Sequence, residues 1–205
     1  MAIIDYGIGN VASIANMLQS ASIPAVVTAD PAVIAQASRL IIAGIGAFDA
    51  GMERLHDRGL VPILTNAVFE KKIPVLGICL GMQLLMQSSE EGDREGLGWI
   101  AGRNVRIGKN PDAEPVKVPH MGWNVIKVRR DSRLLEGLSG DTRFYFAHSY
   151  SVACDNPADV VADAAYGGSF PAIVSHEHVC GVQFHPEKSH RYGRQLLRNF
   201  ASMPF

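Results

Sequence analysis

The sequence predicts an α/β domain in which helices cover both faces of a mostly parallel central sheet, with an added region of antiparallel strands. Short segments that are almost entirely apolar alternate with helical patterns through the first half of the chain, as expected where both faces of a parallel sheet are buried. The second half contains several short strand-like segments with few helices between them. The length of 205 residues suits one domain with a sizeable core.

Apolar periodicity and turn residues place the elements of the first half. The expected strands are residues 2–4, 24–27, 39–43 and 73–78. Helices are expected over 11–21 and 60–71. Between these two helices a short one should begin at Pro31, because Asp30 is a natural N-cap and proline suits the first helical position.

The second half is expected to supply the antiparallel region. Its strand-like segments lie near residues 104–107, 124–128, 144–153, 159–165, 172–175 and 179–184. A final helix is expected over 192–201, where the apolar residues have helical spacing. Because no repeat, low-complexity tract or linker divides the chain, residues 1–205 are expected to form a single domain.

Composition excludes several classes of protein. A formal net charge of -1 offers no basic surface for nucleic acid. No apolar run approaches the roughly 18 residues of a membrane span, and the first residues lack the pattern of a secretory signal. The three cysteines are odd in number and have no framework spacing, which favours a reducing, cytoplasmic setting over disulfides.

Residues 77–83, Gly-Ile-Cys-Leu-Gly-Met-Gln, join an expected strand to a helical pattern and indicate a nucleophile at Cys79. Gly-x-Cys-x-Gly in this setting is a version of the nucleophile elbow, a sharp turn that holds one side chain at the sheet edge. Gly77 and Gly81 permit the crowded backbone of such a turn. The helix N-terminus favours the reactive thiolate, and the N–H of Leu80 is placed to hold an oxyanion. The alternative is a small, buried and inert cysteine.

A cysteine nucleophile needs a base, and His185 is the candidate. An apolar strand leads to His185, and Pro186 stops that strand. Glu187 follows two residues later, where it can accept a hydrogen bond from one ring nitrogen and so orient the other toward a thiol. Taken alone, His-Pro-Glu is more often a surface turn, but Cys79 and His185 supply complementary roles.

The other histidines give weaker signals. His176, His178 and Cys180 have the alternate spacing that faces one side of a strand, so a metal site is conceivable. No fourth ligand is evident, and residues 175–178 resemble the tip of a hairpin, so no metal is expected. The remaining histidines are expected to be surface or packing residues: His56, His120, His148 and His190.

Two segments resemble the signatures of the class I, or triad, glutamine amidotransferases, which have a flavodoxin-like α/β fold. These segments are residues 77–83 and 182–189. Three further segments are similar to the glutaminase-subunit branch of imidazole glycerol phosphate synthase: residues 5–10, 119–124 and 144–150. The resemblance covers essentially the whole chain.

This resemblance implies an activity and a partner. Glutamine is hydrolysed to glutamate and ammonia through a thioester on Cys79, without a cofactor or metal. The ammonia passes to a (βα)8-barrel cyclase subunit, with which the chain would form a heterodimer. There it yields imidazole glycerol phosphate and an aminoimidazole carboxamide ribonucleotide in histidine biosynthesis.

The resemblance also implies roles for individual residues. The triad is Cys79, His185 and Glu187, and the oxyanion is held by N–H groups from Leu80 and from the loop of Gly44, Ile45 and Gly46. The glutamine pocket is lined by Gln83, Glu91, Ser149 and Tyr150. The partner interface is expected to contain Gly9, Asn10, His120, Met121, Trp123, Asn124 and Lys188. An exposed Trp123 would suit a docking face, whereas a tryptophan is by default packed in the core.

The oxyanion loop departs from the family pattern, which is usually Pro-Gly-Val-Gly. This chain has Ala43 in place of the proline, which frees φ and restores a backbone donor. The glycines and the aliphatic residue remain, so the loop keeps its expected role. In the family this loop is completed when the cyclase binds its substrate, and the departure leaves open how active the chain is alone.

Three other interpretations remain. The same glutaminase can serve a related synthase that aminates sugars of surface polysaccharides, and Ala43 gives this some weight. A non-catalytic binding subunit would have no need of Cys79, His185 and Glu187 together. A cysteine peptidase on a similar sheet would not need Gln83 or residues 144–150 in their observed form.

Overall fold

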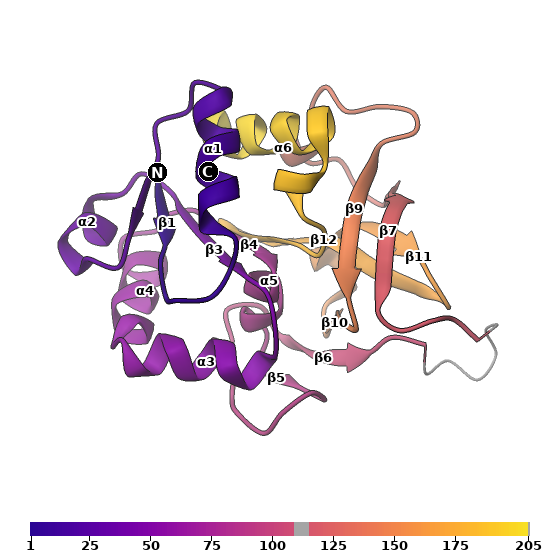
Figure 1. Ribbon diagram of the computed structural model, residues 1–205, viewed down its shortest axis with the longest axis horizontal. Helices are drawn as coiled ribbons and strands as arrows, with labels where there is room; N and C mark the ends of the chain where they lie inside the picture. Colours follow the sequence, from indigo (N-terminus) through magenta and orange to yellow (C-terminus); the bar gives the residue numbers. More distant parts are fainter. Residues whose placement is uncertain (109–114, 205) are drawn as a thin grey trace.

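The computed structural model describes residues 1–108 and 115–204. Its centre is an eight-stranded sheet (Figure 1). Five neighbouring strands are parallel, in the order β2 (Val26–Thr28), β1 (Ala2–Ile4), β3 (Leu40–Gly44), β4 (Val75–Cys79) and β13 (Val179–Val182). The sheet continues antiparallel through β12 (Ser169–His176), β11 (Val160–Ala165) and β8 (Lys127–Val128). The predicted mixed α/β architecture is therefore confirmed.

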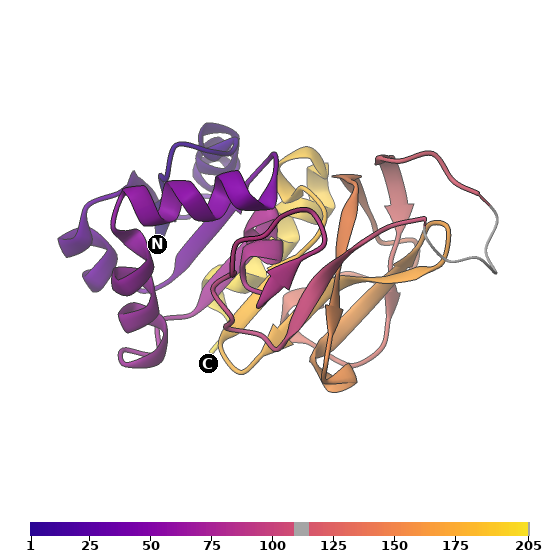
Figure 2. The same cartoon turned by 90° about the horizontal axis from the view of Figure 1, so that it is seen from below.

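Helices cover both faces of the parallel strands (Figures 1 and 2). On one face lie α1 (Val11–Ser20) and α6 (His190–Ser202). The other face is covered by α2 (Pro31–Gln36), α3 (Phe48–Asp57), α4 (Leu60–Phe69) and α5 (Leu80–Leu84). Along β3, Ile41 packs in the first core and Leu40 and Ile42 in the second. Both faces are buried, which explains why these strands are continuously apolar.

Two smaller sheets flank the antiparallel half. One contains β5 (Ser88–Ser89), β6 (Gly102–Arg106) and β10 (Tyr150–Cys154). The other pairs β7 (His120–Val125) with β9 (Arg143–His148). The single strand predicted over 144–153 is wrong, because the chain changes sheets at Ser149. The segment 124–128 is likewise divided between β7 and β8.

Most predicted elements are present, with shifts of one to three residues at their ends. Asp30 caps α2 as expected, accepting a hydrogen bond from the N–H of Ala32 at 2.8 Å. Helix α3 is absent from the predicted elements, although its buried residues have helical spacing: Phe48, Gly51, Met52 and Leu55. Short 3-10 helices occur at Arg133–Leu135, Pro157–Asp159 and Pro186–Lys188.

The order of strands brings distant parts of the chain together. Strand β13 pairs with β4, so Val182 lies opposite Ile78. Both strands run in the same direction, and the residues that follow them therefore meet at one edge of the sheet. Within 1–108 and 115–204, no helix has the length and apolar character to cross a bilayer.

Candidate active site

Cys79 occupies a strained turn between β4 and α5. Its backbone has φ 54° and ψ −110°, an uncommon conformation for a residue with a side chain, and α5 begins at the next residue. A Cβ on Gly81 would lie 1.8 Å from the carbonyl oxygen of Ile42, and one on Gly77 would lie 2.7 Å from that of Gly81. Both glycines are therefore required by backbone crowding, as the Gly-x-Cys-x-Gly pattern predicts.

We expect Gly81→Ala to destabilise the fold by about 3 kcal/mol or more, since the added methyl group meets backbone that cannot easily move. Denaturant unfolding of the purified variant measures this. Gly51→Ala is the matched control, because its Cβ would contact only the ends of Leu80 and Leu84 side chains at 3.0 Å or more. Equal effects of the two substitutions would contradict the crowding argument.

The predicted oxyanion loop lies beside the nucleophile. Gly44 is opposite Cys79 in the register of β3 and β4. Ile45 is 51% exposed and Gly46 has φ +101°, so the chain leaves the sheet directly after Gly44. Ile45, Gly46 and Leu80 all line the cavity above Cys79. Two segments that carry backbone N–H groups therefore border the cavity beside Cys79.

His185 and Glu187 form a buried pair just after β13. Nδ1 of His185 lies 2.9 Å from Oε1 of Glu187, and their side chains are only 4% and 2% exposed. Burial by itself lowers the pKa of His185, but hydrogen bonds with Cys79 and Glu187 and the charges of both groups raise it to about 9. At neutral pH the imidazole therefore carries a proton and faces the Cys79 sulfur.

Cys79 and His185 line a cavity of about 480 Å³. Its lining includes all four side chains predicted to bind glutamine: Gln83, Glu91, Ser149 and Tyr150. The side chain of Gln83 donates to the carbonyl of Tyr150 at 2.9 Å. Oε2 of Glu91 accepts from the N–H of Phe48 at 2.8 Å, which ties the pocket wall to α3.

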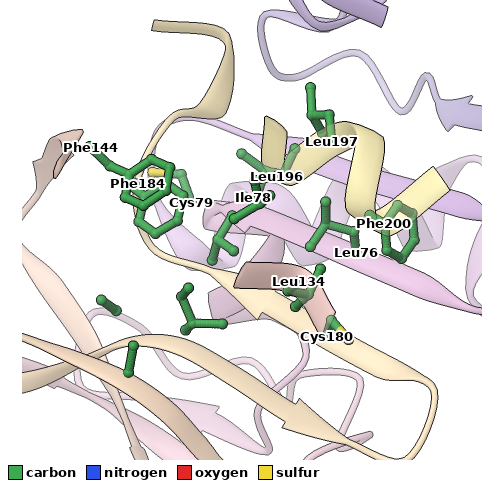
Figure 3. Packing of buried hydrophobic residues seen from close by; sticks show 14 of the residues in the cluster. Leu76, Ile78, Cys79, Leu134, Phe144, Cys180, Phe184, Leu196, Leu197 and Phe200 are labelled. Carbon is green, nitrogen blue, oxygen red and sulfur yellow. The ribbon is translucent and has the colours of Figure 1, made fainter. Parts of the chain in front are cut away.

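Three further residues near Cys79 were not predicted. Gln183 is fully buried, and its Nε2 lies 3.8 Å from Cys79 Sγ. It also accepts a hydrogen bond from Gln83 at 3.2 Å. Figure 3 shows Phe184 and Phe144 beside Cys79, and their rings stack at 3.7 Å. The parallel pairing of β4 with β13 explains why Gln183 reaches Cys79. A prediction that these two strands pair would have placed Gln183 near the thiol.

The predicted partner face is partly exposed. Met121 is 64% and Trp123 44% exposed, so the alternative that Trp123 packs in the core is wrong. Trp123 stacks on His190 at 5.6 Å. Lys188 is exposed, with its ammonium 5.6 Å from the ring centre of Tyr145. Met121 and Lys188 also line the cavity, so this face borders its mouth.

His120 requires a correction, because the structure places it in the interior. Its side chain is 3% exposed, and Nδ1 lies 3.1 Å from Nε2 of His148. Successive residues of a strand face opposite sides, so Met121 faces outward and His120 inward. Asn124 is half-buried, and its side chain donates to the carbonyl of Ala165 at 2.9 Å. Burial lowers the pKa of both His120 and His148 to about 4.

The histidines weighed as metal ligands have separate partners. His176 contacts Asp159 at 3.0 Å, whereas His178 lies 2.8 Å from the carbonyl of Val68. Cys180 lies 3.5 Å from the hydroxyl of Ser175, and burial raises the pKa of its thiol to about 11. Among the residues described, no three His, Cys, Asp or Glu side chains are grouped to hold a metal ion.

Comparisons with known proteins agree with this geometry. The family model "Glutamine amidotransferase class-I" matches residues 2–203, and the chain belongs to that family. It is similar to "Imidazole glycerol phosphate synthase subunit HisH 2" of Methanococcus maripaludis, with 46% identity over 98% of both chains. The protein of the same description from Pseudomonas aeruginosa is 45% identical over 99% of both chains.

Solved structures share the fold at low sequence identity. A structure described as a glutamine amidotransferase has a TM-score of 0.71 and 18% identity, over 98% of this chain and 99% of that one. A glutamine amidotransferase from Thermotoga maritima has a TM-score of 0.60 and 16% identity, over 97% of this chain and 80% of that one. Both place the α/β architecture among glutamine amidotransferases.

Proposed function

We propose that the chain is the glutaminase subunit of an imidazole glycerol phosphate synthase, formed as a single domain over residues 1–205. The observation that carries this proposal is the near-full-length similarity to HisH subunits at 46% identity. It is supported by the buried His185–Glu187 pair beside Cys79. The products of hydrolysis are glutamate and ammonia, and the ammonia is delivered to a cyclase subunit.

The chemistry follows from the charges at the site. The Cys79 thiolate attacks the carboxamide carbon of glutamine and forms a carbon–sulfur bond. Protonated His185 donates its proton to the leaving nitrogen, so ammonia departs and a glutamyl thioester remains. The neutral imidazole then takes a proton from water, whose oxygen attacks the thioester. Glutamate leaves, and the thiolate and the imidazolium are restored.

Backbone donors stabilise the two tetrahedral intermediates. The N–H of Leu80 and an N–H from the loop of Gly44, Ile45 and Gly46 are assigned to the oxyanion. One such donor typically contributes about 10²–10³ in kcat. Gln83, Glu91, Ser149 and Tyr150 are assigned to the glutamine side of the cavity, where carboxylate, amide and hydroxyl groups suit an amino acid's charged ends.

The cyclase subunit is assigned to the face that carries Met121 and Trp123, with Lys188 available for a carboxylate of the partner. This face borders the cavity mouth, so ammonia formed there has a short path to a docked subunit. Gly9 and Asn10 are assigned to its rim. A cytoplasmic location stays a prediction, supported by three cysteines that form no disulfide.

Glutamate release from the purified chain tests the proposal. It is measured alone and with the histidine-pathway cyclase subunit plus its ribonucleotide ligand. Strong activation by that pair is the expected result. If the chain hydrolysed glutamine but the cyclase did not change the rate, the triad assignment would stand and the partner assignment would be rejected. The partner would then be sought among synthases that aminate polysaccharide sugars.

We expect Trp123→Ala to weaken cyclase binding about 30-fold or more, because exposed aromatic anchors carry much of the binding energy at interfaces. Titration calorimetry with the cyclase subunit measures the dissociation constant. Val26→Ala is the control, since Val26 is 47% exposed on β2, the edge strand at the far end of the sheet. An unchanged affinity for the Trp123 variant would place the cyclase on another surface.

A further inference from the structure

Tyr6 carries a buried polar group that the steps above do not use. The residue lies two positions after the end of β1 and is 0% exposed. Its hydroxyl has no hydrogen-bond partner among the described residues. A buried polar group left unsatisfied costs about 1–3 kcal/mol, so each such group in a native protein needs an explanation.

The hydroxyl lies directly against the predicted oxyanion loop. A Cβ placed on Gly44 would be 2.2 Å from the Tyr6 hydroxyl oxygen, so only glycine leaves room for it there. Gly44 is opposite Cys79 in the sheet. Burial raises the pKa of Tyr6, and the charge of Cys79 raises it further. The phenol is therefore neutral, a hydrogen-bond donor, and close enough to Cys79 to sense its charge.

Tyr6 begins a segment that packs on the same loop by its backbone. A Cβ on Gly9, whose φ is +109°, would lie 2.6 Å from the carbonyl oxygen of Ala43. The segment from Tyr6 to Gly9 therefore contacts both Ala43 and Gly44. Gly9 is also assigned to the rim of the partner face. With that assignment, this segment connects the rim to the oxyanion loop.

We propose that Tyr6 is a positioning residue that holds the Gly44–Ile45 peptide in its working orientation. The N–H and C=O of one planar peptide point in opposite directions. When the N–H of Ile45 turns toward the cavity to meet the oxyanion, the carbonyl of Gly44 turns to the interior. The Tyr6 hydroxyl then donates to that carbonyl. This inference rests on the proposed function and names the group that stabilises its oxyanion donor.

The test is Tyr6→Phe, which keeps the ring and removes only the hydroxyl. In the complex with the cyclase and its ribonucleotide ligand, kcat for glutamate release is expected to fall by about tenfold, the effect of one hydrogen bond. KM should change less than about twofold. The unfolding midpoint should stay the same or rise, because a buried unsatisfied group has been removed. The rate of Cys79 alkylation by iodoacetamide should be unchanged.

Two outcomes would overturn the proposal. An unchanged kcat with equal or higher stability would mean that Tyr6 only fills space. A fall in kcat accompanied by a raised KM and lower stability would mean that the ring's packing, and not its hydroxyl, matters. Tyr166→Phe is the control, since its hydroxyl donates to the carbonyl of Lys117 at 2.7 Å, at a site assigned no part in the reaction. If the wild-type complex released no glutamate, the proposed function itself would fail.

Discussion

Glutamate release is expected to fall by about 10⁴-fold or more in Cys79→Ala. The variant has no thiolate to form the thioester, and neither His185 nor Glu187 can take its place as nucleophile. The expected loss is in kcat, whereas glutamine should still bind, because Gln83, Glu91, Ser149 and Tyr150 remain in the cavity. Steady-state assays of the complex with the cyclase measure the rate.

The same variant has a second expected effect, on the charge of its neighbour. Cys79 contributes through both a hydrogen bond and its charge to the raised pKa of His185. Without them, the pKa of His185 should fall from about 9, because burial still lowers it and only Glu187 still raises it. Nuclear magnetic resonance titration of His185 measures this. Cys154→Ala is the control, because Cys154 is a half-buried cysteine outside the cavity. Loss of activity in this control would show that thiol removal acts indirectly.

Replacing Glu187 with glutamine is expected to lower kcat by about 10²–10⁴-fold. The carboxylate accepts from Nδ1 of His185, which leaves the other ring nitrogen for Cys79. Glutamine at 187 removes the negative charge that raises the pKa of His185, and its amide NH₂ can select the wrong tautomer. The imidazole should then lose its proton at a lower pH.

The pH dependence distinguishes this account from general damage to the site. In the wild type, the proton that His185 donates to the leaving nitrogen is retained until pH rises through about 9. In Glu187→Gln the alkaline limb of the kcat profile should move to lower pH. Glu177→Gln is the matched control, since Glu177 lies in the exposed turn between β12 and β13. A Glu187 variant with a lower rate but an unmoved alkaline limb would contradict the assigned role.

Local patterns indicated Cys79 and His185, which the structure brings to one cavity, but gave no sign of several residues around them. Cys79 and His185 each lie in a short segment in which nearby glycines or a proline indicate a turn. Gln183 reaches the site because β13 lies beside β4, and Tyr6 because β1 lies beside β3, the other neighbour of β4. That order depends on long-range pairing, for which a single sequence contains no direct signal.

The error at His120 has a different cause. Residues 119–124 were expected to form a loop, with a strand only from Asn124 onward, whereas β7 spans His120–Val125. Which alternate residues of that strand face outward also depends on what covers it. Tyr166 stacks on the His120 ring at 4.1 Å, and this contact comes from a part of the chain far away in sequence. The break at Ser149 has a similar origin, since β9 and β10 pair with different partners, β7 and β6.

The central position of β13 has a consequence for the order in which activity arises during synthesis. Cys79 leaves the ribosome with the first half of the chain, whereas His185 and Glu187 follow the last strand and can approach the thiol only once β13 has paired with β4. Pairing between segments so distant in sequence closes a large loop and is slow relative to local folding. A nascent or C-terminally shortened chain therefore carries the cysteine without its acid and base, and consumes no glutamine before the sheet is complete.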